Sequence, residues 1–396
     1  VLFDITVYDP LAGQVICIPE GWSAISSYND PANPAMEDIF AGLVADGKVE
    51  FVVNQDGIYW PSQNINLFEG WDVKKGYKIK MNEEGCLGIV GEMPEDKSFT
   101  AMAGASFVPV LCSEPVAAID IFSQLGEDFL YAFDIYNQLV YWPEGGLFTL
   151  NTLEPGIGYL VTMTAEGMAS YDCSKTGETQ ANIIPEPITN APWTVNKTGS
   201  VHLISVQQSA FENMQKGDFF GVFNEDNECA GFVKYDGNQQ NQLLVVYGDD
   251  LTTKTSEGML EAEQMSFKVY HSADQTEVVA NVRFDYDLPN AGIFVENGQS
   301  MILKVTESAT SINETMLNEI NIHPNPGNGL FNIDIPTMDE NITMEVMNMS
   351  GQVILSEVIG NNAAGFQVDL SNKSKGVFFI KFTGKQQTII RKVVVQ

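Results

Sequence analysis

The stretch that decides the fold of the C-terminal part begins with His323-Pro324-Asn325-Pro326-Gly327-Asn328-Gly329 and ends with Lys392-Val393-Val394-Val395-Gln396. Between these ends, apolar and polar residues mostly alternate in short runs separated by Gly, Asn and Ser. The runs are Leu330–Ile335, Ile342–Met349, Gln352–Leu355, Phe366–Leu370, Val377–Phe382 and Thr388–Val395. Alternation with period two places one face of a strand in a core and the other in water. Short strands at this spacing predict an antiparallel, immunoglobulin-like β-sandwich over residues 318–396.

Three motifs follow one another in this segment. The Pro-Asn-Pro turn comes first, then Met344-Glu345-Val346-Met347-Asn348-Met349-Ser350-Gly351-Gln352-Val353, and finally Val368-Asp369-Leu370-Ser371 leading to Lys375-Gly376-Val377-Phe378-Phe379. Together with the basic and apolar end, they closely resemble the type A (Por-type) C-terminal sorting domain of type IX secretion substrates of Bacteroidetes. Phe378 stands where that family more often has Tyr. The residues that match the sorting signal are Pro324, Asn325, Pro326, Gly329, Gly351, Gly376 and Lys392.

The resemblance implies a protein that is exported across the outer membrane and then displayed on the cell surface or released. In this family the domain is a signal for the export machinery, an outer-membrane translocon and its shuttle protein, and it is often removed afterwards. The domain therefore indicates where the protein is exported and not which activity it has. The function itself is expected in residues 1–317.

The net charge excludes some classes of partner. The chain has 52 acidic and 20 basic side chains, which gives a formal charge of −32. Residues 318–396 carry six Lys/Arg and seven Asp/Glu, so almost all of this charge belongs to residues 1–317. Such an acidic surface argues against nucleic acid or an anionic membrane as a partner.

The chain shows no sign of a membrane span or a leader. No apolar run approaches the roughly eighteen residues needed to cross a bilayer. The opening residues Val1–Val7 predict a strand and not a signal peptide. We expect a mature form, or the end of a longer protein.

The five cysteines lack the spacing of a zinc site. An exported protein can form disulfides, and pairs Cys17 with Cys86 and Cys112 with Cys173 would each close one of the two repeats described next. Cys229 would then stay unpaired. The alternative is that all five are buried free thiols.

Residues 21–92 and 103–174 are two copies of one unit. Its landmarks recur 82 residues later: Ile39-Phe40 as Ile121-Phe122, Tyr59-Trp60-Pro61 as Tyr141-Trp142-Pro143, Gly76-Tyr77 as Gly158-Tyr159, and Glu84-Gly85 as Glu166-Gly167. One constant offset over four landmarks indicates a duplication. The expected domains are therefore repeat unit 1 at residues 1–95 and repeat unit 2 at residues 96–180.

Each copy is expected to be a small α+β unit. Pro34 and Pro115 predict helix starts before Ala35–Leu43 and Val116–Leu125, with the preceding polar residue as the cap. A strand and a hairpin that ends at Pro61 or Pro143 follow. The pair resembles a repeat of surface proteins from the same bacteria, marked by Gly21-Trp22-Ser23-Ala24-Ile25-Ser26, and this resemblance implies no particular chemistry.

A third module follows a Pro-rich linker at residues 181–191. Residues 192–306 contain strand-like runs whose number and spacing predict an all-β sandwich. The runs are Val201–Val206, Phe219–Phe223, Gly231–Tyr235, Leu243–Tyr247, Met265–Tyr270, Val278–Phe284 and Ser300–Val305. Residues 307–317, rich in Ser, Thr and Glu, predict a tether to the sorting domain. The whole chain is thus expected to be mainly β with minor α.

The sequence offers little for catalysis. The three histidines are His202, His271 and His323, and none lies in a nucleophile elbow, a metalloprotease helix or a phosphate loop. A Cys229/His202 dyad would lack a visible third group to orient the base. Two carboxylates suffice for glycoside hydrolysis, but acidic side chains mostly solvate a surface. We therefore expect no catalytic residues.

The aromatic landmarks allow two interpretations. Tyr59, Trp60, Tyr141 and Trp142 could present flat faces to sugar rings, because aromatic faces bind apolar C–H surfaces. The alternative, which we favour, is that the tryptophans pack the hairpin onto the helices at Phe40 and Phe122. Acidic turns also make Asp226, Asp249 and Asp250 candidate calcium ligands, although no calcium-binding loop motif is present and no other cofactor is indicated.

These observations predict a non-enzymatic, modular surface protein that binds an extracellular glycan or protein as an adhesion module. Self-association into a surface layer or filament is a second hypothesis. A third is that the chain is the accessory C-terminal part of a larger secreted hydrolase.

Overall fold

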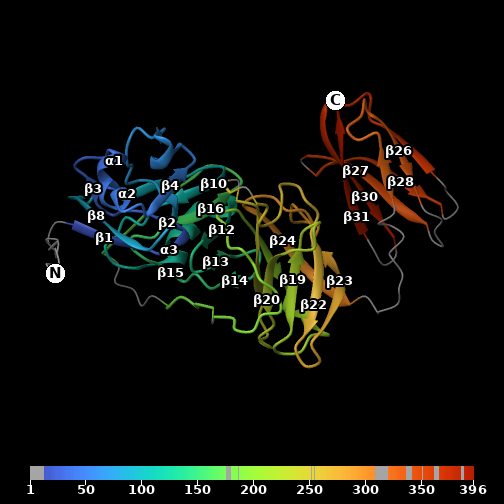
Figure 1. Ribbon diagram of the computed structural model, residues 1–396, viewed down its shortest axis with the longest axis horizontal. Helices are drawn as coiled ribbons and strands as arrows, with labels where there is room; N and C mark the ends of the chain where they lie inside the picture. The colour runs from blue at the N-terminus through green and yellow to red at the C-terminus, as the bar shows by residue number, and fades with distance from the viewer. Residues whose placement is uncertain are drawn as a thin grey trace. The chain divides into compact units, whose positions relative to one another are not determined.

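The computed structural model describes residues 13–174, 180–185, 187–250, 252–253, 255–307, 320–335, 341–349, 351–360, 365–384 and 388–396. The predicted strand at Val1–Val7 and nearly all of the predicted tether lie outside these ranges. The chain forms two compact units, of which the first contains Val1–Glu277 and Val282–Val305 and the second contains Val278–Asn281 and Thr306–Gln396. The mainly β class with short helices is confirmed, and Figure 1 labels the elements.

The first repeat folds around a five-stranded sheet of order β2-β7-β4-β5-β6, beside a smaller sheet of order β1-β8-β3. Its elements are β1 (Gly13–Ile18), β2 (Gly21–Ile25), β3 (Asp30–Pro31), α1 (Met36–Ile39), α2 (Ala41–Ala45), β4 (Val49–Asn54), β5 (Gly57–Trp60), the 3-10 turn η1 (Pro61–Gln63), β6 (Ile65–Asn66), β7 (Tyr77–Met81) and β8 (Gly85–Glu92). Helix α1 starts after Ala35 without a side-chain cap, so the predicted capping is wrong. The predicted single helix is broken at Phe40, which is fully buried.

The second repeat repeats this sheet as β10-β16-β12-β13-β14. Its elements are β9 (Ser98–Ala101), β10 (Gly104–Val108), β11 (Val116–Ala117), α3 (Ala118–Phe122), η2 (Ser123–Asp128), β12 (Phe129–Asp134), β13 (Leu139–Trp142), β14 (Leu147–Phe148), β15 (Thr152–Leu153), β16 (Tyr159–Met163) and β17 (Gly167–Ser170). The predicted helix from Val116 is wrong at both ends, because Val116 pairs with Leu153 as a strand and the helix tightens to 3-10 geometry at Ser123. Its cap, Ala117, also lacks a side-chain hydrogen bond.

The two repeats contact each other reciprocally through the shared Gly-Tyr landmark. The N–H of Gly76 donates to the Phe107 carbonyl over 2.9 Å, and the N–H of Gly158 donates to the Ala24 carbonyl over 3.0 Å. A Cβ at Gly158 would lie 2.6 Å from the Ile25 carbonyl, so only glycine allows this approach. The following tyrosines play matching roles: the Tyr77 hydroxyl accepts from the N–H of Asp72, and the Tyr159 hydroxyl from the N–H of Glu154.

The predicted disulfides are present, one in each repeat. Cys17 is bonded to Cys86 and Cys112 to Cys173, while Cys229 is a free thiol. The first bridge joins the neighbouring strands β1 and β8, in which Cys17 and Cys86 are direct partners. Each bridge closes a long loop of its own repeat, so the free-thiol alternative is wrong for these four cysteines.

The third module consists of one seven-stranded sheet of order β20-β19-β22-β23-β24-β18-β21. Its elements are β18 (Val201–Val206), the 3-10 turn η3 (Gln208–Phe211), β19 (Phe219–Phe223), β20 (Cys229–Lys234), β21 (Gln242–Tyr247), β22 (Ser266–His271), β23 (Thr276–Phe284) and β24 (Gly298–Glu307). All seven predicted runs are strands. The sheet curls so that its end strands, β20 and β21, lie close together. A Cβ at Gly231 of β20 would lie 2.2 Å from the Val245 carbonyl of β21.

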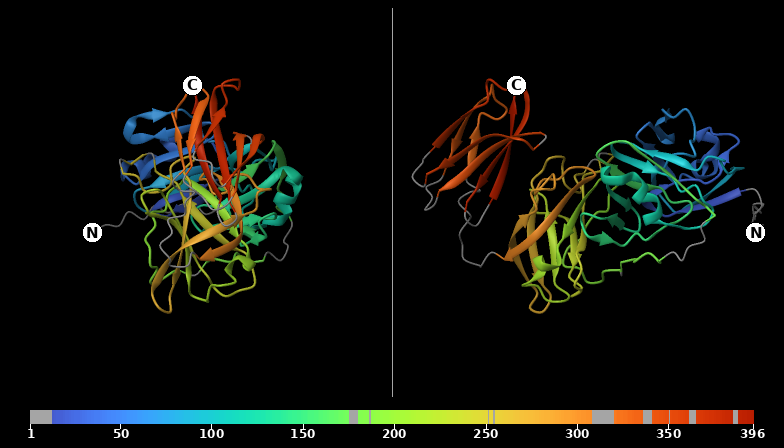
Figure 2. Two further views of the ribbon diagram at one scale, coloured as in Figure 1. Left: turned by 90° about the vertical axis from the view of Figure 1, so that its right-hand side faces the viewer. Right: turned by 180° about the vertical axis from the view of Figure 1, so that it is seen from behind.

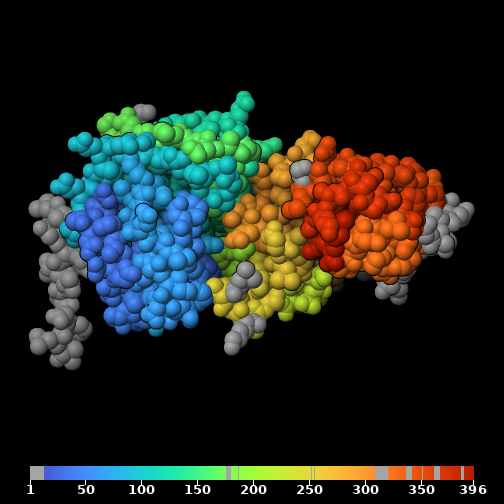
Figure 3. All heavy atoms as spheres, turned by 90° about the horizontal axis from the view of Figure 1, so that it is seen from above, coloured from blue at the N-terminus to red at the C-terminus, as the bar shows by residue number. Residues whose placement is uncertain are grey.

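The second repeat and the third module share a hydrophobic core. Tyr131 and Trp142 from the repeat pack with Leu203 and Met301 from the module, and all four are buried. Figure 2 shows the strands of the repeats, blue to green, beside those of the third module. The predicted linker is not free along its length, since the Asn182 side-chain oxygen accepts the N–H groups of Asn151 and Thr152. Figure 3 shows the two repeats as a continuous blue-to-green surface.

The C-terminal unit is a sandwich of two antiparallel sheets, β25-β26-β29 and β28-β27-β30-β31. Its elements are β25 (Asn321–His323), β26 (Leu330–Asp334), β27 (Ile342–Asn348), β28 (Val353–Ile359), β29 (Gly365–Asp369), β30 (Gly376–Thr383) and β31 (Thr388–Val395). The six strands predicted after the Pro-Asn-Pro turn are present. The inward residues, among them Phe331, Val346 and Ile380, are fully buried and form one core. The predicted sandwich is therefore confirmed.

Candidate functional site

The aromatic landmarks separate onto two faces of each repeat sheet. Tyr59 packs on Phe40 and Tyr141 on Phe122, with ring centroids 6.0 and 5.6 Å apart. The tryptophans face the other way, because successive residues of a strand point to opposite sides. Trp60 packs on Phe51 and Trp142 on Tyr131. The prediction that the tryptophans hold the hairpin to the helices is wrong, because the tyrosines do so.

Burial removes two of the four predicted platform residues. Trp142 is 0% exposed and Tyr59 is 5% exposed, so neither presents a ring face to a ligand. Trp142 lies in the core shared with the third module. Trp60 and Tyr141 are half-buried and keep part of their rings accessible.

Tyr141 lines a cleft of about 370 Å³ on the second repeat. Phe122 forms its floor and is 1% exposed. Phe129 stacks on Phe122 with centroids 5.0 Å apart and an interplanar angle of 14°, and lies 6.0 Å from Tyr141. Burial raises the pKa of Tyr141, so its hydroxyl stays protonated at neutral pH. The volume falls in the range of roughly 300–1,000 Å³ that is typical of small-ligand sites.

Two carboxylates complete the cleft wall. Glu127 comes from the end of η2 and Glu144 follows Pro143 directly after β13. Both side chains are exposed, and neither has a hydrogen-bond or ion-pair partner among the residues that the structure describes. Phe129, Glu127 and Glu144 were not predicted from the sequence. The only feature of the sequence that distinguishes these three residues is that the first repeat lacks them at the equivalent positions.

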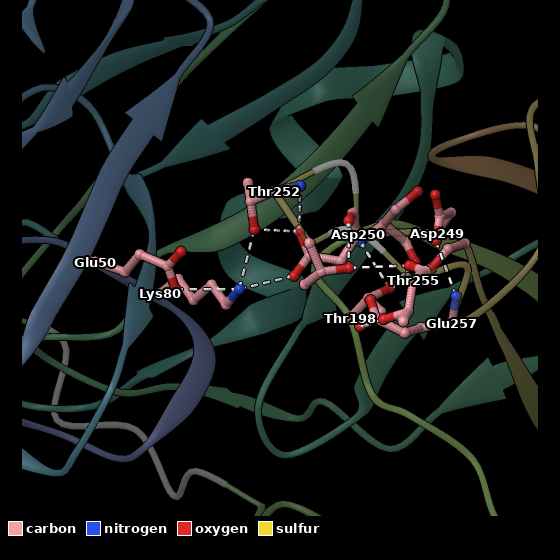
Figure 4. A network of polar contacts seen from close by, with 11 residues as sticks. Glu50, Lys80, Thr198, Asp249, Asp250, Thr252, Thr255 and Glu257 are labelled. Carbon is pink, nitrogen blue, oxygen red and sulfur yellow. Dashed lines mark hydrogen bonds and ion pairs between the residues drawn. The ribbon is translucent and has the colours of Figure 1, made fainter. Parts of the chain in front are cut away.

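The calcium candidates Asp249 and Asp250 take part in a polar network that joins the first repeat to the third module (Figure 4). Lys80 donates to the Asp250 carboxylate over 2.9 Å and also pairs with Glu50 at 3.1 Å. Burial would raise the pKa of Asp250, but hydrogen bonds from Thr252 and Lys80 outweigh it, so that pKa lies below its usual value. The ammonium group of Lys80 therefore already neutralises the Asp250 carboxylate.

The other two calcium candidates differ in their surroundings. Asp249 accepts the N–H of Glu257 over 2.9 Å, and Asp226 lies exposed in the turn between β19 and β20. Within the described ranges, no group of three or more Asp, Glu, His or Cys side chains could hold a metal ion. Calcium binding stays a prediction.

His202 and Cys229 each have a structural environment. The His202 ring is fully buried, with Nε2 2.8 Å from the Ser300 hydroxyl and Nδ1 3.2 Å from the Val295 carbonyl. Burial lowers the pKa of His202 to about 4. Burial likewise raises the pKa of the Cys229 thiol to about 11, and its Sγ contacts the Gly231 carbonyl. A neutral thiol and a neutral imidazole with both nitrogens engaged do not form an activated pair.

The sorting-signal residues converge on the last strand. The Asn325 side chain donates to the Lys392 carbonyl over 2.7 Å and accepts the N–H of Val394 over 2.9 Å. Gly327 continues this pairing, since its N–H donates to the Val394 carbonyl and its carbonyl accepts the N–H of Gln396, both over 2.9 Å. Pro324 and Pro326 lie on either side of Asn325, and each is preceded by a cis peptide bond.

The glycines of the signal lie at turns. Gly329 has a φ of +99°, and a Cβ there would lie 2.6 Å from the backbone of Ser371, so this position requires glycine. Gly351 lies in the turn between β27 and β28, and Gly376 opens β30 opposite Val395. The Lys392 side chain is exposed. Asn325, Gly327 and Gly376 thus lie against the C-terminal strand, whereas Gly351 lies in the turn between β27 and β28.

Residues 321–396 match the family described as "Secretion system C-terminal sorting domain". The chain carries a type IX sorting domain. The protein is therefore a type IX secretion substrate, exported across the outer membrane to the cell surface or the extracellular space, and the domain implies an interaction with the export machinery. No helix of the described part is long and apolar enough to cross a membrane.

Other comparisons of this secretion substrate are weak. A structure titled "Biofilm associated protein - BSP domain" aligns with 97% of the chain at 9% identity and a TM-score of 0.16, and the chain spans 59% of that protein's length. The four N-terminal Ig domains of Dscam1 isoform 4.44 align with 88% of the chain and 91% of that structure at 12% identity and a TM-score of 0.13. No curated protein matches the chain.

Proposed function

We propose that the part of this secretion substrate before the sorting domain is a non-catalytic binding module that contacts a glycan or protein outside the cell. The observation that carries the proposal is the cleft of the second repeat, where Phe129 and Tyr141 form a half-exposed aromatic wall. Aromatic walls with a few polar groups are the usual composition of small-ligand sites.

The surroundings of the cleft support a binding role. The aromatic wall is held by the buried Phe122 below it, and the hairpin β12–β13 is fixed by the core shared with the third module. A rigid site loses little conformational entropy when a ligand binds. Export to the cell surface or beyond places this cleft where extracellular ligands are available.

The environments of the candidate Cys229/His202 dyad support a non-catalytic role. Cys229 is protonated at neutral pH and His202 is uncharged with both ring nitrogens engaged. Neither residue lines the cleft. The surface-layer and hydrolase-accessory hypotheses stay predictions.

An array of polysaccharides and extracellular proteins tests the proposal with three forms of the full chain. We expect at least one ligand whose signal falls about tenfold in Tyr141→Leu and persists in Tyr136→Leu. Tyr136 is a matched control, because it is 50% exposed on the same repeat but outside the cleft. Circular dichroism checks that both variants fold. Uniform silence, or equal loss in both variants, contradicts the proposal.

A further inference from the structure

The second repeat differs in charge from the rest of the chain. Between residues 98 and 174 the sequence contains nine Asp/Glu and no Lys, Arg or His. The first repeat carries five lysines between residues 13 and 92. The cleft therefore lies in a part of the chain where no side chain of the same module neutralises its carboxylates.

The cleft combines two features that favour a cation. The π faces of Phe129 and Tyr141 attract a cation through the ring quadrupole, and the neutral phenol of Tyr141 keeps a hydroxyl for hydrogen bonding. Glu127 and Glu144 add two carboxylates that have no described partner. An anion would meet repulsion from both carboxylates, and a neutral sugar would leave their charges unused.

The first repeat shows what the same scaffold looks like without these features. Val49 and Phe129 are equivalent, since they pair with Met81 and Met163, which are 82 residues apart. The residue before Val49 is Lys48, whereas Phe129 follows an aspartate. Ser62 stands 82 residues before Glu144. Phe129 and the acidic rim thus belong to the second repeat alone, whereas Tyr141 has a buried counterpart in Tyr59.

We propose that this cleft binds a lysine or arginine side chain of an extracellular polypeptide, inserted against Phe129 and Tyr141 and neutralised by Glu127 and Glu144. The volume of about 370 Å³ accommodates one long side chain with part of its backbone. The inference rests on the proposed binding function and names the ligand chemistry of the same cleft.

The test uses capped, amidated pentapeptides with one central Arg or Lys among glycines, titrated against the full chain by ligand-observed NMR. We expect the corresponding citrulline and acetyl-lysine peptides to bind at least about fivefold more weakly, because they keep the shape but lose the charge. In Glu127→Gln/Glu144→Gln, the Arg and Lys peptides should weaken roughly three- to tenfold, while the uncharged peptides stay unchanged.

A second double variant separates a specific site from diffuse attraction. Glu114→Gln/Glu166→Gln removes the same charge from exposed positions of the same repeat outside the cleft, and we expect it to bind like the original chain. Equal weakening in both double variants would overturn the proposal, because long-range attraction by the acidic chain would then suffice.

The outcomes also distinguish the two proposals. Cellohexaose binding that is lost in Tyr141→Leu but kept in Glu127→Gln/Glu144→Gln would support the cleft and overturn the cationic ligand. If all probes are silent, or none depends on Tyr141, the cationic ligand is wrong. The array experiment then decides the binding function independently.

Discussion

The side-chain amide of Asn325 donates a hydrogen bond to the backbone carbonyl of Lys392 over 2.7 Å, across 67 residues of sequence. The same side chain accepts the N–H of Val394. One asparagine therefore ties the first turn of the sorting domain to its last strand. Both ends of the signal form a single structure, although they are far apart in the chain.

Replacing Asn325 should loosen the last strand. Asn325→Ala removes two hydrogen bonds, each worth about 1 kcal/mol, so we expect the protection free energy of the Val394 amide to fall by about 1–2 kcal/mol. Hydrogen exchange read by mass spectrometry on the C-terminal peptide measures this change. Asn328→Ala is the control, because among the described residues that side chain makes only a long local contact of 3.4 Å. Equal exchange in both variants would refute a stabilising link between Asn325 and the last strand.

The contact between the repeats should depend on glycine at position 158. Gly158→Ala places a methyl group against the Ile25 carbonyl, and we expect the free energy of unfolding of the first unit to fall by about 2 kcal/mol. Gly42→Ala, in α2 with open space around the added methyl, should be neutral or stabilising. Denaturant titration compares the two, and similar values for both variants would contradict the close approach.

The disulfide of the second repeat should contribute substantially to stability. Cys112→Ala/Cys173→Ala opens a loop with a sequence separation of 61 residues, and we expect a loss of about 2–4 kcal/mol. Cys229→Ala keeps both bridges and should cost about 1 kcal/mol or less. Urea unfolding of the oxidised proteins measures the difference. No greater loss in the double variant than in Cys229→Ala would count against a stabilising bridge.

Acid should destabilise the third module through His202. Its pKa is about 4 in the folded chain, below the unfolded value of about 6.5. Between these values the unfolded state binds the extra proton, so stability is fully present above pH 6.5 and declines as pH falls toward 4. This group alone should contribute a loss of about 2–3 kcal/mol by pH 4.5.

The variant His202→Gln isolates this term. Glutamine keeps hydrogen-bonding capacity near Ser300 and Val295 but does not titrate. We expect the difference in unfolding free energy between pH 7.5 and pH 4.5 to be smaller in the variant by about 2 kcal/mol. Parallel pH curves for the two proteins would show that His202 is not the group responsible.

Lys80 should contribute more to the free energy of unfolding than an ordinary surface lysine. Lys80→Met leaves the Asp250 carboxylate, 6% exposed, without its cation, and we expect a loss of about 3 kcal/mol. Lys75→Met removes ion pairs to Asp56 and Asp72 that are half-exposed, so its loss should stay within about 1 kcal/mol. Thermal unfolding compares them. Equal losses would mean that the Lys80 pair is no more important than a surface pair.

The strands and the duplication were predictable because both are local patterns. Strand-like runs located β18, β19 and β31 at their observed bounds, and the 82-residue offset identified Gly76 and Gly158 as equivalent. The helices were predicted less well, since Phe40 breaks one helix to reach the core and Val116 pairs with Leu153 instead of continuing the other. These outcomes depend on tertiary contacts that override local preference.

The candidate site could be predicted only in part. Tyr141 was named from its landmark, but whether its ring or that of Trp142 faces water depends on which side of the sheet the third module covers. No sequence pattern pairs Lys80 with Asp250, because the two residues are 170 positions apart and meet only when the modules pack.

The sequence by itself determined the export of this protein, its repeated β-rich modules and its acidic charge. These properties depend on the order of motifs, on short-range alternation and on composition, all of which can be read from consecutive residues. Only the tertiary structure decided which aromatic rings are accessible and which acids are paired. It did so because burial and long-range pairing arise when surfaces of distant segments pack against each other, as Trp142 does on the third module while Tyr141 stays at the cleft.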